Sequence, residues 1–211
     1  MTDMGVEATK RSRLRSSGAD NTFQWMTRNT RVNSGYEKMF KGQLLKTLPH
    51  NVVSYEPVRL PLVESGLVKD VYTPDFILPT LYVNGKVVAI EPHGAPLVSA
   101  KYLEKIGAVR DMYNLYLVLA SDVEKVGIEK RFGLKVKDFV NDYWYVPNSK
   151  FAKGQPRSRY ETVLRIRIED LLQLTEKGEN YLPYLKTAAR FYNTMAKAER
   201  MEFTDLLRAA A

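Results

Sequence analysis

One stretch of the chain, residues 72 to 93 (YTPDFILPTLYVNGKVVAIEPH), constrains the fold more than any other. Its first part, Tyr72–Val83, is rich in β-branched and aromatic residues, and its last part, Lys86–Glu91, is apolar again. Asn84-Gly85 between them is a strong signal for the tight turn of a β-hairpin. The stretch therefore predicts two antiparallel strands that form a central hairpin.

Two carboxylates mark one end of this hairpin. Asp75 follows a proline near the start of the first strand and Glu91 closes the second, so antiparallel pairing brings both to the same end. His93 lies two residues beyond Glu91 and therefore shares its face of an extended strand. Carboxylates that converge with a third polar group at a sheet edge are typical of Mg²⁺ sites, because this hard cation takes one or two carboxylates beside water and phosphate.

The composition is that of an ordinary globular protein with an excess of positive charge. The 211 residues are 45% hydrophobic and 27% charged, and the net charge of +8 favours a polyanionic partner, although a solvated Lys-rich surface has the same composition. The absence of cysteine and the presence of only two histidines exclude thiolate and His-rich zinc sites. No apolar run is long enough for a membrane span or a signal peptide, so we expect a cytoplasmic protein that is not secreted and has no membrane partner.

Residues 1 to 33 form a predicted basic N-terminal arm ahead of a single domain that spans residues 34 to 211. The arm is rich in Ser, Gly, Asn and Thr, a composition that fits either a solvated terminus or a DNA-contacting segment. Its candidate nucleic-acid contacts are Lys10, Arg11, Arg13 and Arg15.

The domain is predicted to begin with a helix over Tyr36–Thr47, whose apolar residues follow the helical period and which Pro49 terminates. Glu37 lies in the first turn, where the helix dipole favours any acidic residue, so a surface position and a functional role are both open. A loosely alternating strand over Val52–Leu62 follows, interrupted by two prolines. Glu64-Ser65-Gly66 is then a predicted loop before the hairpin.

After the hairpin, Ser99 is a candidate N-cap for a helix over Ala100–Tyr113, and the apolar run Tyr116–Ser121 predicts a buried strand. The resulting order over residues 34 to 121 is helix, three strands, helix, strand. This order predicts one compact α/β (α+β) core in which helices flank a mixed central sheet.

Residues 122 to 211 are predicted to form a mainly helical extension, with helices over Asp122–Arg131, Lys137–Tyr143 and Tyr184–Arg208. One alternating run, residues 164 to 168, predicts a further strand. The aromatic residues 143 to 145 suit either a core or base stacking. Between these segments, a Ser/Gly/Pro loop carries four candidate phosphate contacts, which are Lys150, Lys153, Arg157 and Arg159.

The combination of Glu37 in the first helix, Pro74-Asp75 in the hairpin and Glu91 followed by His93 resembles the PD-(D/E)xK nuclease superfamily. The resemblance covers residues 34 to 121 and implies a restriction-endonuclease-like αβββαβ core. Within the superfamily the chain is most similar to archaeal Holliday-junction resolvases, which carry a Glu in the first helix and a Ser-Gly loop where this chain has Ser65-Gly66. Overall similarity also points to a member from an archaeal virus, which would act in the host cytoplasm.

The resemblance implies a Mg²⁺- or Mn²⁺-dependent endonuclease that acts on branched or duplex DNA in replication, repair or recombination. Asp75 and Glu91 would bind the cation together with the Pro92 carbonyl, and Glu37 would take an outer or second metal position. Ser65, the basic arm and the basic loop would contact the nucleic acid, and the cationic contacts would make binding strongly salt-dependent.

One position departs from the superfamily pattern. His93 replaces the motif lysine, and a neutral imidazole lacks the permanent positive charge that lysine supplies near the scissile phosphate. In one interpretation His93 positions or deprotonates the attacking water, and in another a lysine such as Lys101 takes over. In a third, the site is weak or inactive and the chain is a nuclease-fold DNA-binding protein. The sequence is equally consistent with His93 being a loop histidine at a strand end that has no catalytic role.

The resolvase resemblance also implies a homodimer, because a four-way junction needs two symmetric cuts. Apolar and aromatic residues in the C-terminal half fit either a dimer interface or the closure of the monomer's own core. These residues include Tyr181, Tyr184, Phe191, Tyr192, Met195 and Phe203.

Overall fold

The computed structural model of the chain describes residues 35–49, 51–65, 67–94, 98–147 and 157–209. Within these ranges, no helix combines the length and the apolar character needed to cross a bilayer. Several predicted nucleic-acid contacts lie outside the described residues or have side chains outside them: Lys10, Arg11, Arg13, Arg15, Lys150, Lys153, Arg157 and Arg159. Their roles, and the division into an arm and a single domain, stay predictions.

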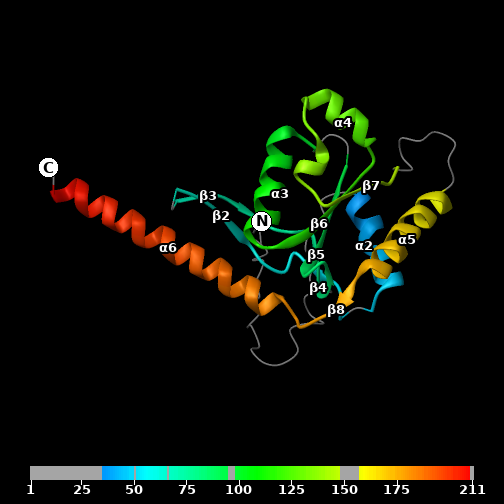
Figure 1. The fold of residues 1–211 in the computed structure, drawn as a ribbon, viewed down its shortest axis with the longest axis horizontal. Coiled ribbons are helices and arrows are strands. Elements are labelled where there is room, and N and C mark those ends of the chain that lie inside the picture. The colour runs from blue at the N-terminus through cyan, green and yellow to red at the C-terminus, as the bar shows by residue number, and fades with distance from the viewer. Residues whose placement is uncertain (1–34, 50, 66, 95–97, 148–156, 210–211) are drawn as a thin grey trace, which may run out of the picture.

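A mixed sheet forms the centre of the molecule (Figure 1). Its strands lie in the order β1, β4, β5, β6, β7, with β1 and β8 sharing one edge of β4. The β1, β4 and β5 strands pair antiparallel, whereas β5, β6 and β7 are parallel. The bounds of the strands are Ser54–Tyr55 (β1), Phe76–Val83 (β4), Lys86–His93 (β5), Leu115–Ser121 (β6), Asp142–Tyr145 (β7) and Glu176–Lys177 (β8).

The hairpin predicted from the sequence is confirmed as β4 and β5. Asn84 and Gly85 have φ angles of 51° and 72°, which the two central residues of a type I′ turn require. The pairing begins with Val83 opposite Lys86 at the turn, shifts at an irregularity between Leu78 and Tyr82 of β4, and ends with Phe76 opposite Ile90. Asp75, which directly precedes β4, therefore falls beside Glu91 near the end of β5.

Helices cover both faces of the sheet, which confirms the predicted mixed α/β class (Figure 1). Successive strand residues point to opposite faces, so Val88 and Ile90 pack on one side while Val87 and Ala89 pack on the other. The first side is covered by α2 (Gly35–Thr47) and α5 (Arg157–Leu174). The second is covered by α3 (Ala100–Met112), by the start of α6 (Leu182–Ala209) and by a small hairpin, β2 (Leu60–Glu64) and β3 (Leu67–Tyr72).

The helix and strand predicted after the hairpin are also confirmed. Ser99 caps α3, because its hydroxyl accepts a hydrogen bond from the backbone N–H of Tyr102 at 3.1 Å. The apolar residues of α3, including Leu103 and Ile106, face the sheet. The β6 strand is buried beside β5, as its continuous apolar sequence predicted.

The predicted first strand over Val52–Leu62 is wrong as one element. It divides at Pro57 into β1, which pairs with β4, and β2, which pairs with β3 in a separate two-stranded sheet. The cause is local, because proline has no N–H to continue a ladder. Of the predicted loop at Glu64-Ser65-Gly66, Glu64 is the last residue of β2, Ser65 follows it in a turn with a φ of 50°, and Gly66 lies outside the described residues.

Two predictions in the C-terminal half are wrong. The segment predicted as a helix over Lys137–Tyr143 contains the end of a short 3₁₀ helix (Val136–Asp138) and then the first residues of β7. The run predicted as a strand at residues 164 to 168 lies inside α5. The helices predicted over Asp122–Arg131 and Tyr184–Arg208 correspond to α4 (Lys125–Phe132) and α6.

Ile166 and Ile168 distinguish the two interpretations of α5. In a strand both side chains would face the same side, but in the helix Ile168 is fully buried while Ile166 is 46% exposed. We expect Ile168→Ala to lower the free energy of unfolding by about 2 to 5 kcal/mol and Ile166→Ala to change it by less than about 0.5 kcal/mol, measured by urea denaturation. Equal costs for the two substitutions would contradict the helical assignment.

Candidate metal centre

Acidic side chains gather at one edge of the sheet. The parallel strands β5, β6 and β7 end together there, with His93 opposite Ser121 and Ser121 opposite Tyr145. The antiparallel β4 begins at this edge, immediately after Asp75. Ligand sites in open α/β sheets commonly lie beyond the carboxyl ends of the parallel strands.

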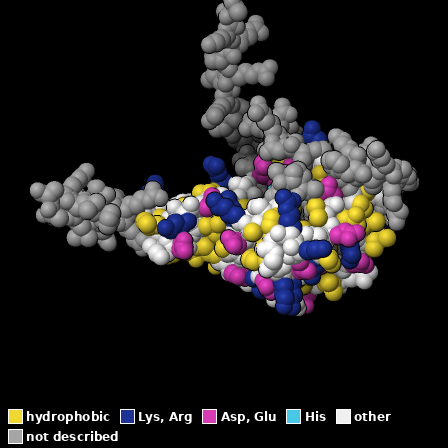
Figure 2. Space-filling view, turned by 90° about the horizontal axis from the view of Figure 1, so that it is seen from above, with side chains coloured by type: hydrophobic (Ala, Val, Ile, Leu, Met, Phe, Trp, Pro, Cys, Tyr) yellow, Lys and Arg dark blue, Asp and Glu magenta, His cyan; other side chains and the backbone are white. Residues whose placement is uncertain are grey.

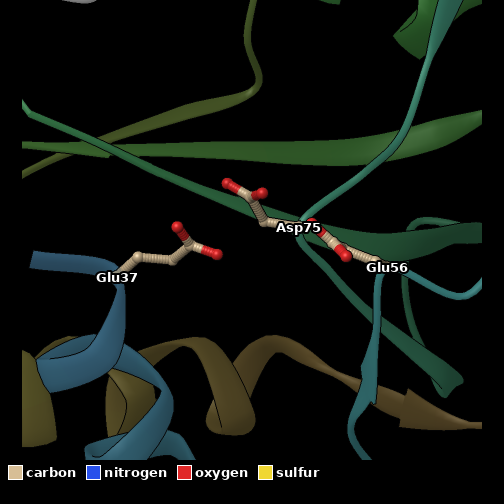
Figure 3. A group of neighbouring side chains, drawn as sticks. All are labelled: Glu37, Glu56 and Asp75. Atoms are coloured by element: carbon tan, nitrogen blue, oxygen red, sulfur yellow. The ribbon is translucent and has the colours of Figure 1, made fainter. Parts of the chain in front are cut away.

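Three carboxylates approach one another at this edge (Figure 3). Glu37, Glu56 and Asp75 each offer one carboxylate oxygen, and these three oxygens lie within 4.8 Å of one another. The residues come from three separate places in the chain, namely the start of α2, the segment after β1 and the residue before β4. The three oxygens are close enough to bind one cation together.

Glu37 is held in place by its neighbours on both sides. The first turn of α2 is fixed by Tyr36, whose hydroxyl donates a hydrogen bond to the carbonyl of Val146 at 3.0 Å. Phe40 on the next turn is fully buried against Phe76 and Trp144. The hydroxyl of Tyr55 donates a hydrogen bond to Oε1 of Glu37. Glu37 is itself buried, so the surface position that the sequence left open is wrong.

Glu56 joins the cluster although the sequence analysis did not identify it. Its backbone N–H donates a hydrogen bond to the carbonyl of Asp75 at 2.9 Å, and this bond continues the pairing of β1 with β4 by one residue. Its φ of 42° lies in the left-handed region that only a few non-glycine residues adopt. The sequence feature that could have identified Glu56 is its position directly before Pro57, where the predicted strand is interrupted.

The predicted proximity of Asp75 and Glu91 is confirmed. The backbone N–H of Asp75 donates a hydrogen bond to Oε1 of Glu91 at 3.1 Å, and Glu91 is only 2% exposed. Glu91 and His93 also share one face as predicted, because Tyr102 of α3 contacts both. Its hydroxyl donates to Oε2 of Glu91 at 3.4 Å, and its ring stacks on the His93 imidazole with 4.0 Å between the ring centres.

Burial and crowding raise the pKa values of these acids. The pKa of Asp75 is raised above its usual value by burial and then by the negative charges of Glu91, Glu37 and Glu56. The pKa of Glu91 is also raised, chiefly by burial. Burial followed by the charge of Glu37 raises the pKa of Glu56. A bound cation would neutralise this repulsion, which makes the cluster a favourable place for one.

Lys41 lies beside the acidic cluster, although the sequence analysis did not identify it. It lies one helical turn after Glu37, and its Nζ atom is 4.1 Å from the centre of the Tyr55 ring, a cation–π contact. Its positive charge partly offsets the burial that raises the pKa of Glu56. Lys101, the lysine predicted from the sequence, is exposed on α3. There the pKa of Asp70 is lowered chiefly by a hydrogen bond from Lys105 and to a smaller extent by the positive charge of Lys101.

The remaining predicted residues lie in different surroundings. Pro92 is buried in β5 opposite Ala120, so a metal-binding role for its carbonyl stays a prediction. Ser65 is exposed in the turn between β2 and β3, and its contact with nucleic acid also stays a prediction. Of the aromatic residues 143 to 145, Trp144 belongs to the core, whereas Tyr145 is 40% exposed.

Basic side chains do not form a separate stripe on the face shown in Figure 2. Among the described residues on that face, Lys and Arg side chains are interspersed with Asp and Glu side chains. The net charge of +8 belongs to the whole sequence, including the predicted basic arm and residues 148 to 156 of the predicted basic loop, which the structure does not describe; Arg157 and Arg159 lie at the start of α5 and not in a loop.

Comparison of the chain with protein-family models, curated proteins and solved structures finds no match. The function must therefore be inferred from the geometry and chemistry of the site.

The raised pKa of Asp75 predicts how stability depends on pH. The folded state holds the Asp75 proton more tightly than the unfolded state, so in EDTA the contribution of Asp75 to stability is greatest below about pH 4 and is lost as the pH rises through the raised pKa of about 10. At pH 8 in EDTA we expect Asp75→Asn to raise the free energy of unfolding by at least about 1 kcal/mol, measured by thermal unfolding. At pH 4 we expect the gain to disappear.

Asp70→Asn is the matched control. The pKa of Asp70 is lowered by its hydrogen bond from Lys105, so neutralising this carboxylate should give no gain at pH 8. Destabilisation of the protein by Asp75→Asn at pH 8 would contradict the view that the cluster carries unfavourable negative charge.

Proposed function

We propose that this chain is a Mg²⁺- or Mn²⁺-dependent DNA endonuclease of the PD-(D/E)xK type. The observation that carries the proposal is the convergence of Glu37, Glu56 and Asp75 within 4.8 Å, with Glu91 hydrogen-bonded to Asp75 beside them. Mg²⁺ and Mn²⁺ prefer carboxylate, carbonyl and water oxygens, and this cluster offers oxygen ligands.

The order of elements around the site supports the same family. A helix carrying Glu37 is followed by three antiparallel sheet strands, β1, β4 and β5, then by α3, and then by β6 parallel to β5. This is the order expected of an αβββαβ nuclease core, with Asp75 and Glu91 on adjacent strands. The β2–β3 hairpin is an insertion between β1 and β4.

Each residue of the site has a proposed role. Asp75 links the parts of the site, because its carboxylate lies near those of Glu37 and Glu56 and its backbone N–H donates to Glu91, and these carboxylates would hold the cation. When bound, a divalent cation makes an attached water more acidic and neutralises charge on the phosphate. Tyr102 fixes the ring of His93 by stacking, so that His93 can orient the attacking water and accept its proton.

The charge of Lys41 suits the role of the missing motif lysine. Its ammonium group is held over Tyr55, the residue that hydrogen-bonds Glu37, at the α2 side of the cluster. A lysine is a permanent point charge, which a neutral imidazole cannot replace. Lys41 would therefore stabilise the negative charge that develops on the phosphate during cleavage.

We propose further that the chain acts on branched DNA and does so as a homodimer. The exposed aromatic rings of Tyr184 and Phe191 on α6, which extends from the body of the molecule, support an interface there (Figure 1). Tyr181 and Tyr192 instead pack on the monomer's own core. Light scattering tests the dimer, because a mass near 24.2 kDa would indicate a monomer and point to a single-cut nuclease.

A second candidate is a nuclease-fold protein that binds DNA without cleaving it. The observation that favours it is the histidine at position 93, where the superfamily has lysine. Both candidates bind DNA through cationic groups, so in both cases affinity should fall steeply with salt. A dissociation constant that stays constant between low and high salt would contradict both.

Cleavage assays with carboxylate variants test the enzyme directly. We expect the wild-type protein with Mg²⁺ or Mn²⁺ to cut at least one substrate among four-way junction, flap, duplex and single-stranded DNA. We expect Asp75→Asn and Glu56→Gln each to lower the cleavage rate by more than about 100-fold, because loss of a ligand should cost at least as much as loss of a supporting residue. Glu176→Gln is the control, since β8 pairs with the end of β4 remote from Asp75.

If Asp75→Asn cleaved DNA at the wild-type rate, Asp75 would not be a ligand of the catalytic metal. A wild-type protein that binds DNA but cuts none of the four substrates with either metal would favour the non-catalytic candidate.

Substitution of Lys41 and of Lys101 tests which of the two supplies the positive charge of the motif lysine. We expect Lys41→Ala to lower the cleavage rate by roughly tenfold or more, because it removes a charge near the developing negative charge. Lys101→Ala should leave the rate close to that of the wild type. The opposite ranking, measured under single-turnover conditions, would return the role to Lys101.

A further inference from the structure

The hydroxyl of Tyr72 is buried and makes no well-aligned hydrogen bond, although it lies within reach of the Glu91 carboxylate. Tyr72 is the last residue of β3 and is only 6% exposed. Among the side chains that the structure describes, Tyr72 and Tyr160 carry the buried polar atoms that have no partner. An unsatisfied buried hydroxyl lowers stability, so its presence calls for a physical explanation.

The environment of Tyr72 connects its hydroxyl with the acidic cluster. The ring packs in the layer between the sheet and α3. Burial, followed by the negative charge of Glu91, raises the pKa of Tyr72 well above its usual value, so the hydroxyl remains a proton donor. Although burial raises the pKa of Glu91 overall, the nearby Tyr72 hydroxyl acts in the opposite direction. Tyr72 is therefore close enough to favour the charged form of Glu91.

Tyr102 approaches Glu91 from α3. Its hydroxyl donates to Oε2 of Glu91 at 3.4 Å, while the Asp75 backbone N–H donates to Oε1 at 3.1 Å. Each carboxylate oxygen can accept about two hydrogen bonds, so the carboxylate can also accept one from Tyr72 and still bind a cation. Glu91 is thus surrounded by donors from β3, from α3 and from the residue before β4.

We propose that Tyr72 and Tyr102 are positioning residues that hold the Glu91 carboxylate in the orientation needed to bind a divalent cation. The inference rests on the proposed function and adds a second layer to its site. Hydrogen bonds to a ligand carboxylate restrict its rotation, and loss of such a supporting group typically weakens metal affinity by about 10- to 100-fold. Tyr102 also holds His93 by stacking, so one helix turn supports both residues.

Removing the hydroxyl of Tyr72 or of Tyr102 tests whether it positions Glu91 or has only a structural role. Tyr72→Phe keeps the ring and removes an unsatisfied buried group, so a structural role predicts unchanged or higher stability and unchanged metal affinity. A positioning role predicts unchanged or higher stability with weaker metal affinity. Tyr102→Phe keeps the ring available to stack on His93 and tests the same carboxylate from the other side.

Tyr160→Phe is the matched control, because Tyr160 carries the other buried hydroxyl without a partner. Its neighbour Glu161 pairs with Lys46, nine residues beyond Glu37 and thus about 13 Å along α2 at 1.5 Å per residue. This substitution removes an equivalent hydroxyl at a distance from the acidic cluster.

The experiment measures Mn²⁺ binding to the full chain by electron paramagnetic resonance, together with the midpoint of thermal unfolding in EDTA. We expect Tyr72→Phe and Tyr102→Phe each to raise the dissociation constant for Mn²⁺ by about 10- to 100-fold without any loss of Tm in Tyr72→Phe. Tyr160→Phe should bind Mn²⁺ with the wild-type dissociation constant.

Wild-type Mn²⁺ affinity in both Tyr72→Phe and Tyr102→Phe would overturn this inference alone. An equal loss of affinity in Tyr160→Phe would also overturn it. A wild-type chain that binds no Mn²⁺ would instead overturn the proposed function, and this inference with it.

Discussion

The mutual repulsion of the carboxylates of Glu37, Glu56, Asp75 and Glu91 is the constraint on which the rest of the site depends. Buried acids of like charge oppose folding unless the surrounding structure holds them together or a cation neutralises them. Here the two apolar layers on either side of the sheet hold them, with Phe40 and Phe76 among the core residues next to the acids. We infer that the chain keeps this unfavourable arrangement because it binds a cation.

The geometry of the cluster follows from backbone features at some distance from it. The type I′ turn at Asn84-Gly85 starts the pairing of β4 with β5, and the register shift between Leu78 and Tyr82 of β4 then places Asp75 beside Glu91. The break at Pro57 ends β1 and leaves Glu56 in a left-handed conformation opposite Asp75. A turn, a register shift within β4 and a break between two strands thus determine which carboxylates meet.

The parts predicted correctly from the sequence depend on local patterns. The hairpin, the helix capped by Ser99 and the apolar β6 strand each have a turn, cap or period within a few residues, and the hairpin brings Asp75 and Glu91 to the same end. Their direct pairing depends in addition on the register shift within β4, which was not predicted. Lys41, one helical turn after Glu37, could have been identified from helical spacing, whereas Glu56 was missed because its proximity to the site depends on the pairing of β1 with β4. The same limit explains α5, where alternating residues at 164 to 168 fit a strand locally but pack as a helix through Leu164 and Ile168.

The central claim is that the carboxylates at this sheet edge hold a divalent cation. Anomalous X-ray scattering from crystals grown with Mn²⁺ tests this claim most directly, because it locates the metal without reference to activity. The account predicts an anomalous peak within coordination distance of Asp75 and of Glu37 or Glu56, and no such peak in crystals of Asp75→Ala. A peak elsewhere on the protein, or none at this edge in the wild type, would contradict the account.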